Sequence, residues 1–102
     1  MSRIDKIQAQ LAIAPDDPFL NYCLAMELAS VQDVAGARAA FQKVQQLAPQ
    51  DVAAFFQEGQ LLAAEGETDA AREVLQQGID RARSVGNDHA LAEMVGFLDT
   101  LS

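Results

Sequence analysis

The sequence predicts an all-α protein built as a stack of helix–turn–helix units. Apolar residues recur at three- and four-residue steps along most of the chain, which is the spacing of one face of an α-helix. A pattern also returns after 34 residues, since Pro49 follows Pro15 at that interval and Phe41 aligns with Leu75. Residues that start or stop helices, chiefly Asp, Pro and Gly, separate the apolar stretches. We therefore expect a single domain over residues 1–102.

The first half of the chain is predicted to hold three helices. A short amphipathic helix over about residues 3–13 ends before Pro15, because a residue that precedes proline avoids helical backbone. Asp17 is expected to cap the second helix with its side chain, and Pro18 suits the first helical position. A third helix begins after a tight turn at Asp33.

The second half repeats this plan with glycine stops. A fourth helix follows Pro49 and ends at Gly66, since glycine readily adopts the left-handed backbone of a helix exit. Thr68 is a candidate cap for the fifth helix, which runs to a second stop at Gly86. A last helix follows, capped by the Asn or the Asp of the next two positions, residues 87–88.

Two stretches carry the residues of a known 34-residue repeat. The first is Asn21-x₂-Leu24-Ala25-x₂-Leu28…Ala37-x₃-Phe41…Pro49, and the second is Phe55-x₂-Glu58-Gly59-x₂-Leu62…Ala71-x₃-Leu75. This pattern resembles the tetratricopeptide repeat (TPR) family, and in particular its short stand-alone bacterial members. The resemblance implies a right-handed α-solenoid with full repeats at 18–49 and 52–85, a partial repeat at 3–15 and a C-terminal capping helix at 88–101. In each full repeat we call the first helix A and the second helix B.

Three residues of the second repeat carry structural expectations. Glu58 stands where the family has a buried Leu, and a buried carboxylate is costly unless it is paired. It either pairs with one of Arg81 and Arg83 or is partly exposed at an edge, and we expect the edge. Mid-helix glycine costs ~1 kcal/mol relative to alanine, so Gly59 and Gly78 predict close contacts between helices.

Charge and location follow from composition. The chain has 15 acidic and 7 basic residues, a formal net charge of −8, and its basic residues are scattered. Nucleic acid and anionic membranes need clustered Lys and Arg, so neither is an expected partner. A single cysteine, Cys23, cannot form an internal disulfide, and no apolar run reaches the length of a signal peptide or of a membrane span. We expect a cytoplasmic protein.

No residue pattern predicts catalysis or a cofactor. His89 and Glu93 are four apart on the last helix, a spacing that can hold a metal, but structural zinc sites need four ligands, mostly Cys or His. The chain has one Cys and one His, far apart in sequence, and no glycine-rich phosphate loop. We therefore predict no catalytic, metal or cofactor site, and no enzyme.

The resemblance implies protein–protein interaction through the inner, concave face that the A helices line. The matching residues form an apolar stripe suited to an amphipathic helix or an extended peptide: Phe19, Tyr22, Met26, Ser30, Phe56, Gln60 and Ala63. Alternatively, Tyr22, Met26 and Phe56 are core residues that the last helix covers through Leu91, Met94 and Phe97. The family's carboxylate clamp should not be carried over, because Tyr22 and Met26 occupy positions of its basic ligands.

The partner itself is an unidentified protein or peptide. One alternative is homodimer formation, in which the same face meets its own copy. A second alternative, from another functional class, is a small-ligand or enzymatic site under the last helix.

Overall fold

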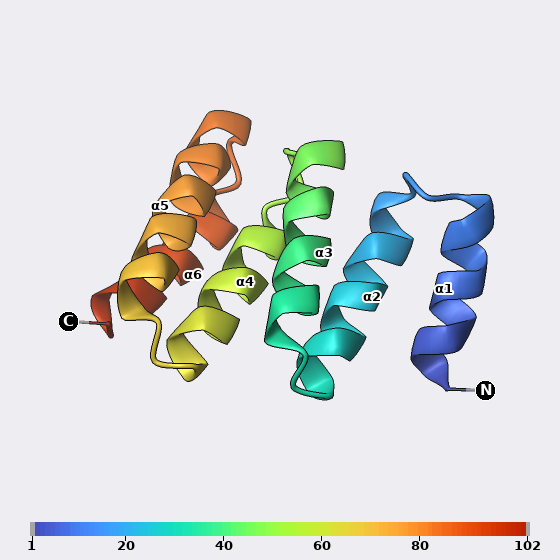
Figure 1. The fold of residues 1–102 in the computed structure, drawn as a ribbon. Helices are drawn as coiled ribbons and strands as arrows, with labels where there is room; N and C mark the ends of the chain where they lie inside the picture. The colour runs from blue at the N-terminus through green and yellow to red at the C-terminus, as the bar shows by residue number, and fades with distance from the viewer. Residues whose placement is uncertain (1, 102) are drawn as a thin grey trace. The chain divides into compact units, whose positions relative to one another are not determined.

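The computed structural model describes residues 2–101, and these contain six α-helices and no β-strand. The helices are α1 (Arg3–Ile13), α2 (Pro18–Ser30), α3 (Val34–Leu47), α4 (Ala53–Ala64), α5 (Thr68–Val85) and α6 (Asp88–Asp99) (Figure 1). The all-α helical-repeat prediction is confirmed. The chain divides into two compact units, one up to Ala48 and one from Pro49 onward, and each is described by itself. A single domain over residues 1–102 stays a prediction.

Local side-chain chemistry sets the helix starts of the first unit. The Asp17 carboxylate accepts a hydrogen bond from the Leu20 amide at 3.1 Å, and Pro18 is the first residue of α2. Asp33 caps α3 in the same way through the Gly36 amide, at 3.0 Å. Both residues satisfy amides that the first turn of a helix leaves without a partner. The cap predicted at Asp17 is confirmed.

In the second unit the glycine stops are confirmed and one cap is not. Gly66 and Gly86 have φ of 78° and 73°, the left-handed backbone of a helix exit. Asn87 caps α6 by accepting from the Ala90 amide at 3.0 Å. Thr68 is not a cap, because it is already the first residue of α5 and the capping position falls on Glu67, whose side chain makes no cap bond.

The first unit packs α2 between α1 and α3. Helices α2 and α3 pack on each other, and the apolar residues that they bury are Ala25 of α2 and Ala37, Ala40, Phe41 and Val44 of α3. Asn21, which stands where the repeat pattern has an aromatic residue, is also buried. Its amide donates to the carbonyls of Pro15 and Asp17, at 3.0 and 2.8 Å, so it fastens the turn between α1 and α2.

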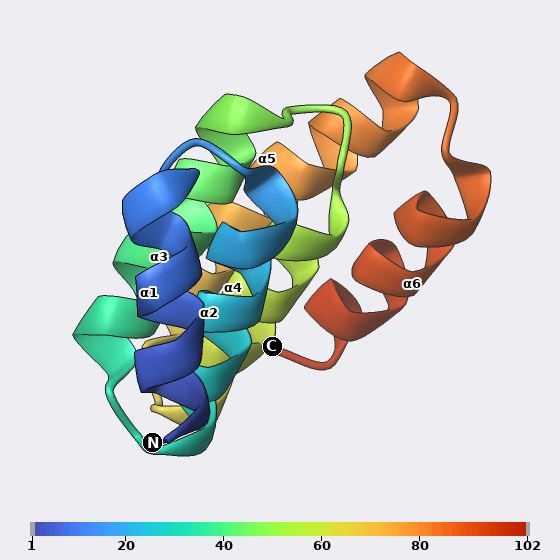
Figure 2. The same ribbon diagram turned by 90° about the vertical axis from the view of Figure 1, so that its right-hand side faces the viewer.

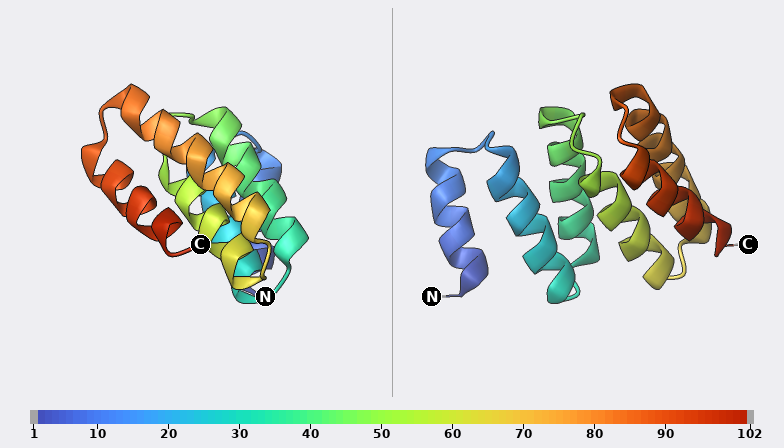
Figure 3. Two further views of the ribbon diagram at one scale, coloured as in Figure 1. Left: turned by 90° about the vertical axis from the view of Figure 1, so that its left-hand side faces the viewer. Right: turned by 180° about the vertical axis from the view of Figure 1, so that it is seen from behind.

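The second unit packs α5 against both α4 and α6 (Figure 3). Its close contacts explain two mid-helix glycines. A Cβ at Gly59 would lie 2.6 Å from Leu75 Cδ2, and a Cβ at Gly78 would lie 2.6 Å from Phe55 Cβ and 2.7 Å from Met94 Sδ. The helices therefore approach as closely as these glycines allow, as the sequence predicted.

The edge position expected for Glu58 is wrong. Glu58 is 1% exposed, because the register of α4 puts it on the face that also buries Gly59 and Leu62. No buried side-chain nitrogen or oxygen among the described residues lacks a hydrogen-bond partner. Arg83, one of the two cations considered as its partner, instead lies 3.6 Å from Asp80.

Candidate functional site

The predicted site residues of the first repeat lie in one stripe along α2. Phe19 is 71% exposed and Met26 is 39% exposed, whereas Tyr22 is half-buried with its ring against that of Phe41 (centroids 6.1 Å apart, planes at 72°). Ser30 is exposed at the end of the stripe and donates its hydroxyl to the Glu27 carbonyl. An aromatic ring and a methionine on one helix face are therefore left in water.

Helices α1 and α2 lie side by side (Figure 2). A cleft of about 510 Å³ is lined by residues of both helices. Its volume lies in the ~300–1,000 Å³ range of ligand clefts. Three members of the predicted stripe share this concave surface with residues of α1. Its walls are Arg3, Lys6, Ile7 and Gln10 from α1, and Phe19, Leu20, Tyr22, Cys23, Met26 and Glu27 from α2.

The charged side chains of the cleft come mainly from α1. Arg3 Nη1 lies 3.0 Å from Glu27 Oε1, so this pair joins α1 to α2. Lys6, one turn further along α1, has no ion pair among the described residues. The cleft carries two cations and one anion in a chain whose net charge is −8.

The predicted site residues of the second repeat are less open. Phe56, Gln60 and Ala63 are all half-buried on α4. The ring of Phe56 packs edge-on against Phe97 of α6, with centroids 5.9 Å apart, and Ala63 lies against the core of this unit. Helix α6 therefore contacts the stripe of α4 at Phe56.

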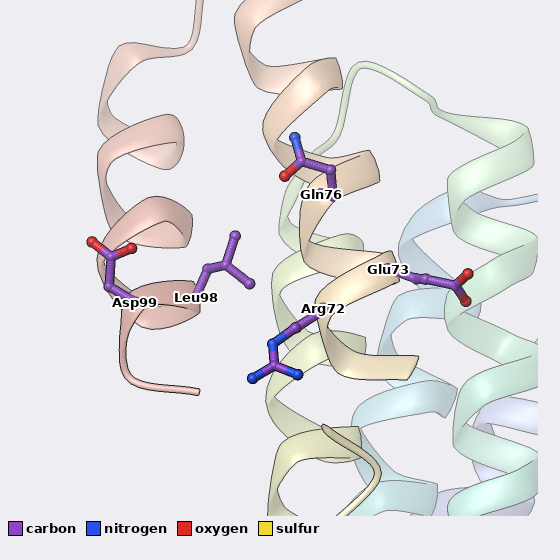
Figure 4. Close-up of a pocket in the computed structure, with 5 residues that line it drawn as sticks. All are labelled: Arg72, Glu73, Gln76, Leu98 and Asp99. Atoms are coloured by element: carbon purple, nitrogen blue, oxygen red, sulfur yellow. The ribbon is translucent and has the colours of Figure 1, made fainter. Parts of the chain in front are cut away.

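A further cleft of about 550 Å³ lies between α5 and α6. Figure 4 shows the carboxylates of Glu73 and Asp99 pointing to opposite sides, so they do not converge on one point. Arg72 is 3.3 Å from Asp69 and also donates to the carbonyl of Leu101. The arginine thus joins α5 to Leu101, which follows α6.

The residues considered for metal binding are His89 and Glu93 in the second unit and Cys23 in the first unit. His89 Nε2 lies 3.1 Å from Glu93 Oε1 on the exposed side of α6. Cys23 is a free, half-buried thiol in the cleft between α1 and α2. Within residues 2–101 no three His, Cys, Asp or Glu side chains gather as metal ligands would. None of the helices described there combines the length and apolar character needed to cross a membrane.

Known proteins of similar sequence or structure place the chain in a family. No protein-family model matches it, and neither does any curated protein. Among solved structures, a tetratricopeptide repeat domain protein from Salinibacter ruber is 30% identical, with a TM-score of 0.78 over 86% of this chain and 89% of that chain. The chain belongs to the tetratricopeptide repeat family.

More distant proteins share the fold of this TPR chain. A protein from Bordetella parapertussis is 23% identical, with a TM-score of 0.83 over 99% of this chain and 88% of that chain. The TPR2B domain of yeast Sti1, solved in a complex with pHsp70, is 20% identical, with a TM-score of 0.85 over 96% of this chain and 78% of that one. At these identities the likeness concerns the fold alone.

The contribution of α1 to the cleft is what sequence reasoning missed in this TPR chain. The signal that could have found it is the 34-residue register, in which Arg3 and Lys6 align with Ala37 and Ala40 of the first repeat. Polar residues at positions that are small and buried in a complete repeat indicate a surface that meets water or a ligand.

Proposed function

We propose that this TPR chain is a protein-interaction module that holds a helix or an extended peptide of a partner protein against the apolar stripe of α2. The observation that carries the proposal is the exposure of Phe19, at 71%, on the wall of a cleft that also contains Tyr22 and Met26. Tyr22, Met26 and Ser30 extend the contact along α2. In the second unit, Phe56, Gln60 and Ala63 of α4 are proposed separately as residues that contact a partner.

The energetics favour a binding role for this stripe. Burying a phenylalanine or methionine side chain contributes ~1.5–3 kcal/mol. A partner gains this free energy only from side chains that remain exposed after folding. Methionine adapts to ligands of different shape, and interface energy concentrates in a few aromatic anchors. Phe19 and Met26 supply one side chain of each kind.

The TPR2B domain of yeast Sti1 supports a protein as the kind of partner, since that domain was solved in a complex with pHsp70. We further propose a role without catalysis or cofactor, in the cytoplasm, with neither nucleic acid nor membrane as partner. The scattered cations and the net charge of −8 support the last two points.

Site-specific photocrosslinking tests the proposal. A benzophenone amino acid replaces Phe19 in one variant and Gln46, an exposed residue of α3, in the control. In an extract of the source organism, the probe at position 19 should capture a protein that the probe at position 46 does not. Phe19→Ala should then weaken binding of the purified partner about tenfold or more, while the free energy of unfolding stays within ~0.5 kcal/mol. Equal capture at both positions, or unchanged affinity, would refute the proposed surface.

A second copy of the chain is the alternative partner, because the exposed ring of Phe19 is available to self-association as well. Sedimentation velocity over a hundredfold range of concentration distinguishes the two. A dimer that Phe19→Ala dissociates would favour the alternative.

A further inference from the structure

Helix α1 occupies the place of a B helix in the 34-residue register. Ile7 aligns with Phe41 of α3 and with Leu75 of α5. Helices α3 and α5 each pack against the A helix of their own repeat, α2 and α4 respectively. Within its unit α1 packs on α2, and none of its residues is buried. The face by which a B helix receives its A helix is therefore open on α1.

The second unit shows which B-helix positions form that face. Leu75 of α5 packs on Gly59 of α4, and Gly78 of α5 packs on Phe55 of α4, so closely that a Cβ on either glycine would lie 2.6 Å from the facing side chain. The counterparts of Leu75 and Gly78 on α1 are Ile7 and Gln10. Both line the cleft of about 510 Å³ between α1 and α2. In the repeat register the cleft thus corresponds to the position of an A helix, which favours a helical ligand.

The chemistry of this cleft differs from that of a complete repeat. Arg3 and Lys6 stand where α5 has Ala71 and Val74, both buried. Two cations thus lie beside the apolar side chains of Ile7, Phe19 and Met26. Glu27 engages Arg3 at 3.0 Å, while Lys6 is left without an ion pair among the described residues. A ligand that fits this cleft should therefore present an apolar stripe with a negative charge beside it.

We propose that the cleft between α1 and α2 binds an amphipathic helix of a partner protein, with its apolar stripe on Ile7, Phe19 and Met26 and an Asp or Glu facing Lys6. This inference rests on the proposed function, because it names the occupant of the same face of α2. The side chains of the helix carry the recognition, so a free C-terminal carboxylate is not required. Salt should weaken the preference for acidic helices, because the Debye length falls from about 8 Å at 0.15 M to about 3 Å at 1 M.

Selection from a display library tests the occupant. The library consists of 16-residue peptides with leucine fixed at helical spacing and with Glu, Lys, Gln or Ser at the flanking positions. Selection on the full chain should enrich Glu along one flank, and selection on Lys6→Glu should not. The best peptide is then made with an acetylated N-terminus and an amidated C-terminus, and its binding is measured by fluorescence anisotropy.

Matched variants separate local charge from net charge. Lys6→Glu should weaken binding of the amidated peptide by about 3- to 30-fold, because an exposed ion pair becomes a repulsion of similar size. Arg81→Glu makes the same change of net charge on α5 and should change the affinity less than twofold. Proline in the middle of the peptide, which breaks a helix, should abolish binding.

The outcomes distinguish this inference from the proposed function. Peptides that bind through Phe19 with neutral or basic flanks would refute the acidic character of the ligand. Peptides that bind equally well with and without proline would refute its helical form. Either result would leave the proposed binding surface on α2 standing. No enrichment over selection on Phe19→Ala would overturn both. Self-association that Lys6→Glu abolishes would assign the cleft to a second copy of the chain and overturn a separate partner.

Discussion

Adding one methyl group at Gly78 should destabilise the protein, although alanine is the better helix former. The new Cβ would lie 2.6 Å from Phe55 Cβ and 2.7 Å from Met94 Sδ, whereas ordinary contact begins near 3.4 Å. The Phe55 Cβ is fixed to the backbone of α4, so α4 and α5 must move apart by most of the missing ~1 Å. Overpacking of this kind costs ~1–3 kcal/mol, and the gain in helix propensity of ~1 kcal/mol offsets part of it. The difference leaves a net loss of up to ~2 kcal/mol for Gly78→Ala.

Gly96 supplies the matched control for this prediction. It lies in α6, and nothing comes within 4 Å of a Cβ built there. Gly96→Ala should therefore gain ~0.5–1 kcal/mol, from propensity alone. Urea unfolding followed by far-UV circular dichroism measures both, and each 1 kcal/mol corresponds to ~4–8 °C in Tm for a domain of this size. If Gly78→Ala unfolds at or above the wild-type midpoint, the close approach of α4, α5 and α6 inferred from Gly78 is wrong.

Three further predictions concern unfolding measured in the same way. Phe19→Ala should leave stability within ~0.5 kcal/mol, whereas Phe41→Ala, at a ring that is 1% exposed, should cost ~3–5 kcal/mol; similar losses would contradict the open stripe. Asn21→Ala leaves two carbonyls without their side-chain donor and should cost ~1–3 kcal/mol, and a neutral result would mean that water replaces the amide. Asn87→Ala removes a cap and should cost ~1 kcal/mol, while Thr68→Ala should change little; a larger loss at Thr68 would restore it as a cap.

The helices and most of their ends could be predicted because they depend on local chemistry. Asp17 caps α2, and Gly66 ends α4 with left-handed backbone, and both effects depend only on residues nearby in the sequence. Thr68 shows the limit of this reasoning, since a shift of one residue in the start of a helix turns a cap into a helical position. Glu58 shows another limit, because the packing around α4 buries a carboxylate that its own chemistry would place in water.

The candidate site was harder to predict than the fold. Phe19 and Phe41 both lie on helices at apolar spacing, yet one is 71% and the other 1% exposed. Only the packing of neighbouring helices separates an exposed ring from a core ring. The cleft required the same information. From the sequence alone Lys6 cannot be distinguished from any other exposed lysine, and only the packing of α1 on α2 places it in the cleft.

The absence of any buried residue on α1 has a consequence for motion. A helix that buries so little apolar surface opens locally at a small fraction of the free energy of global unfolding. Amide hydrogens of Ile7 and its neighbours should therefore exchange faster than those around Phe41 on α3. Because α1 forms one wall of the cleft, opening of α1 also removes the binding surface, and a bound helix would hold α1 closed. Slower exchange confined to α1 would then report occupancy of the cleft before the partner has been identified.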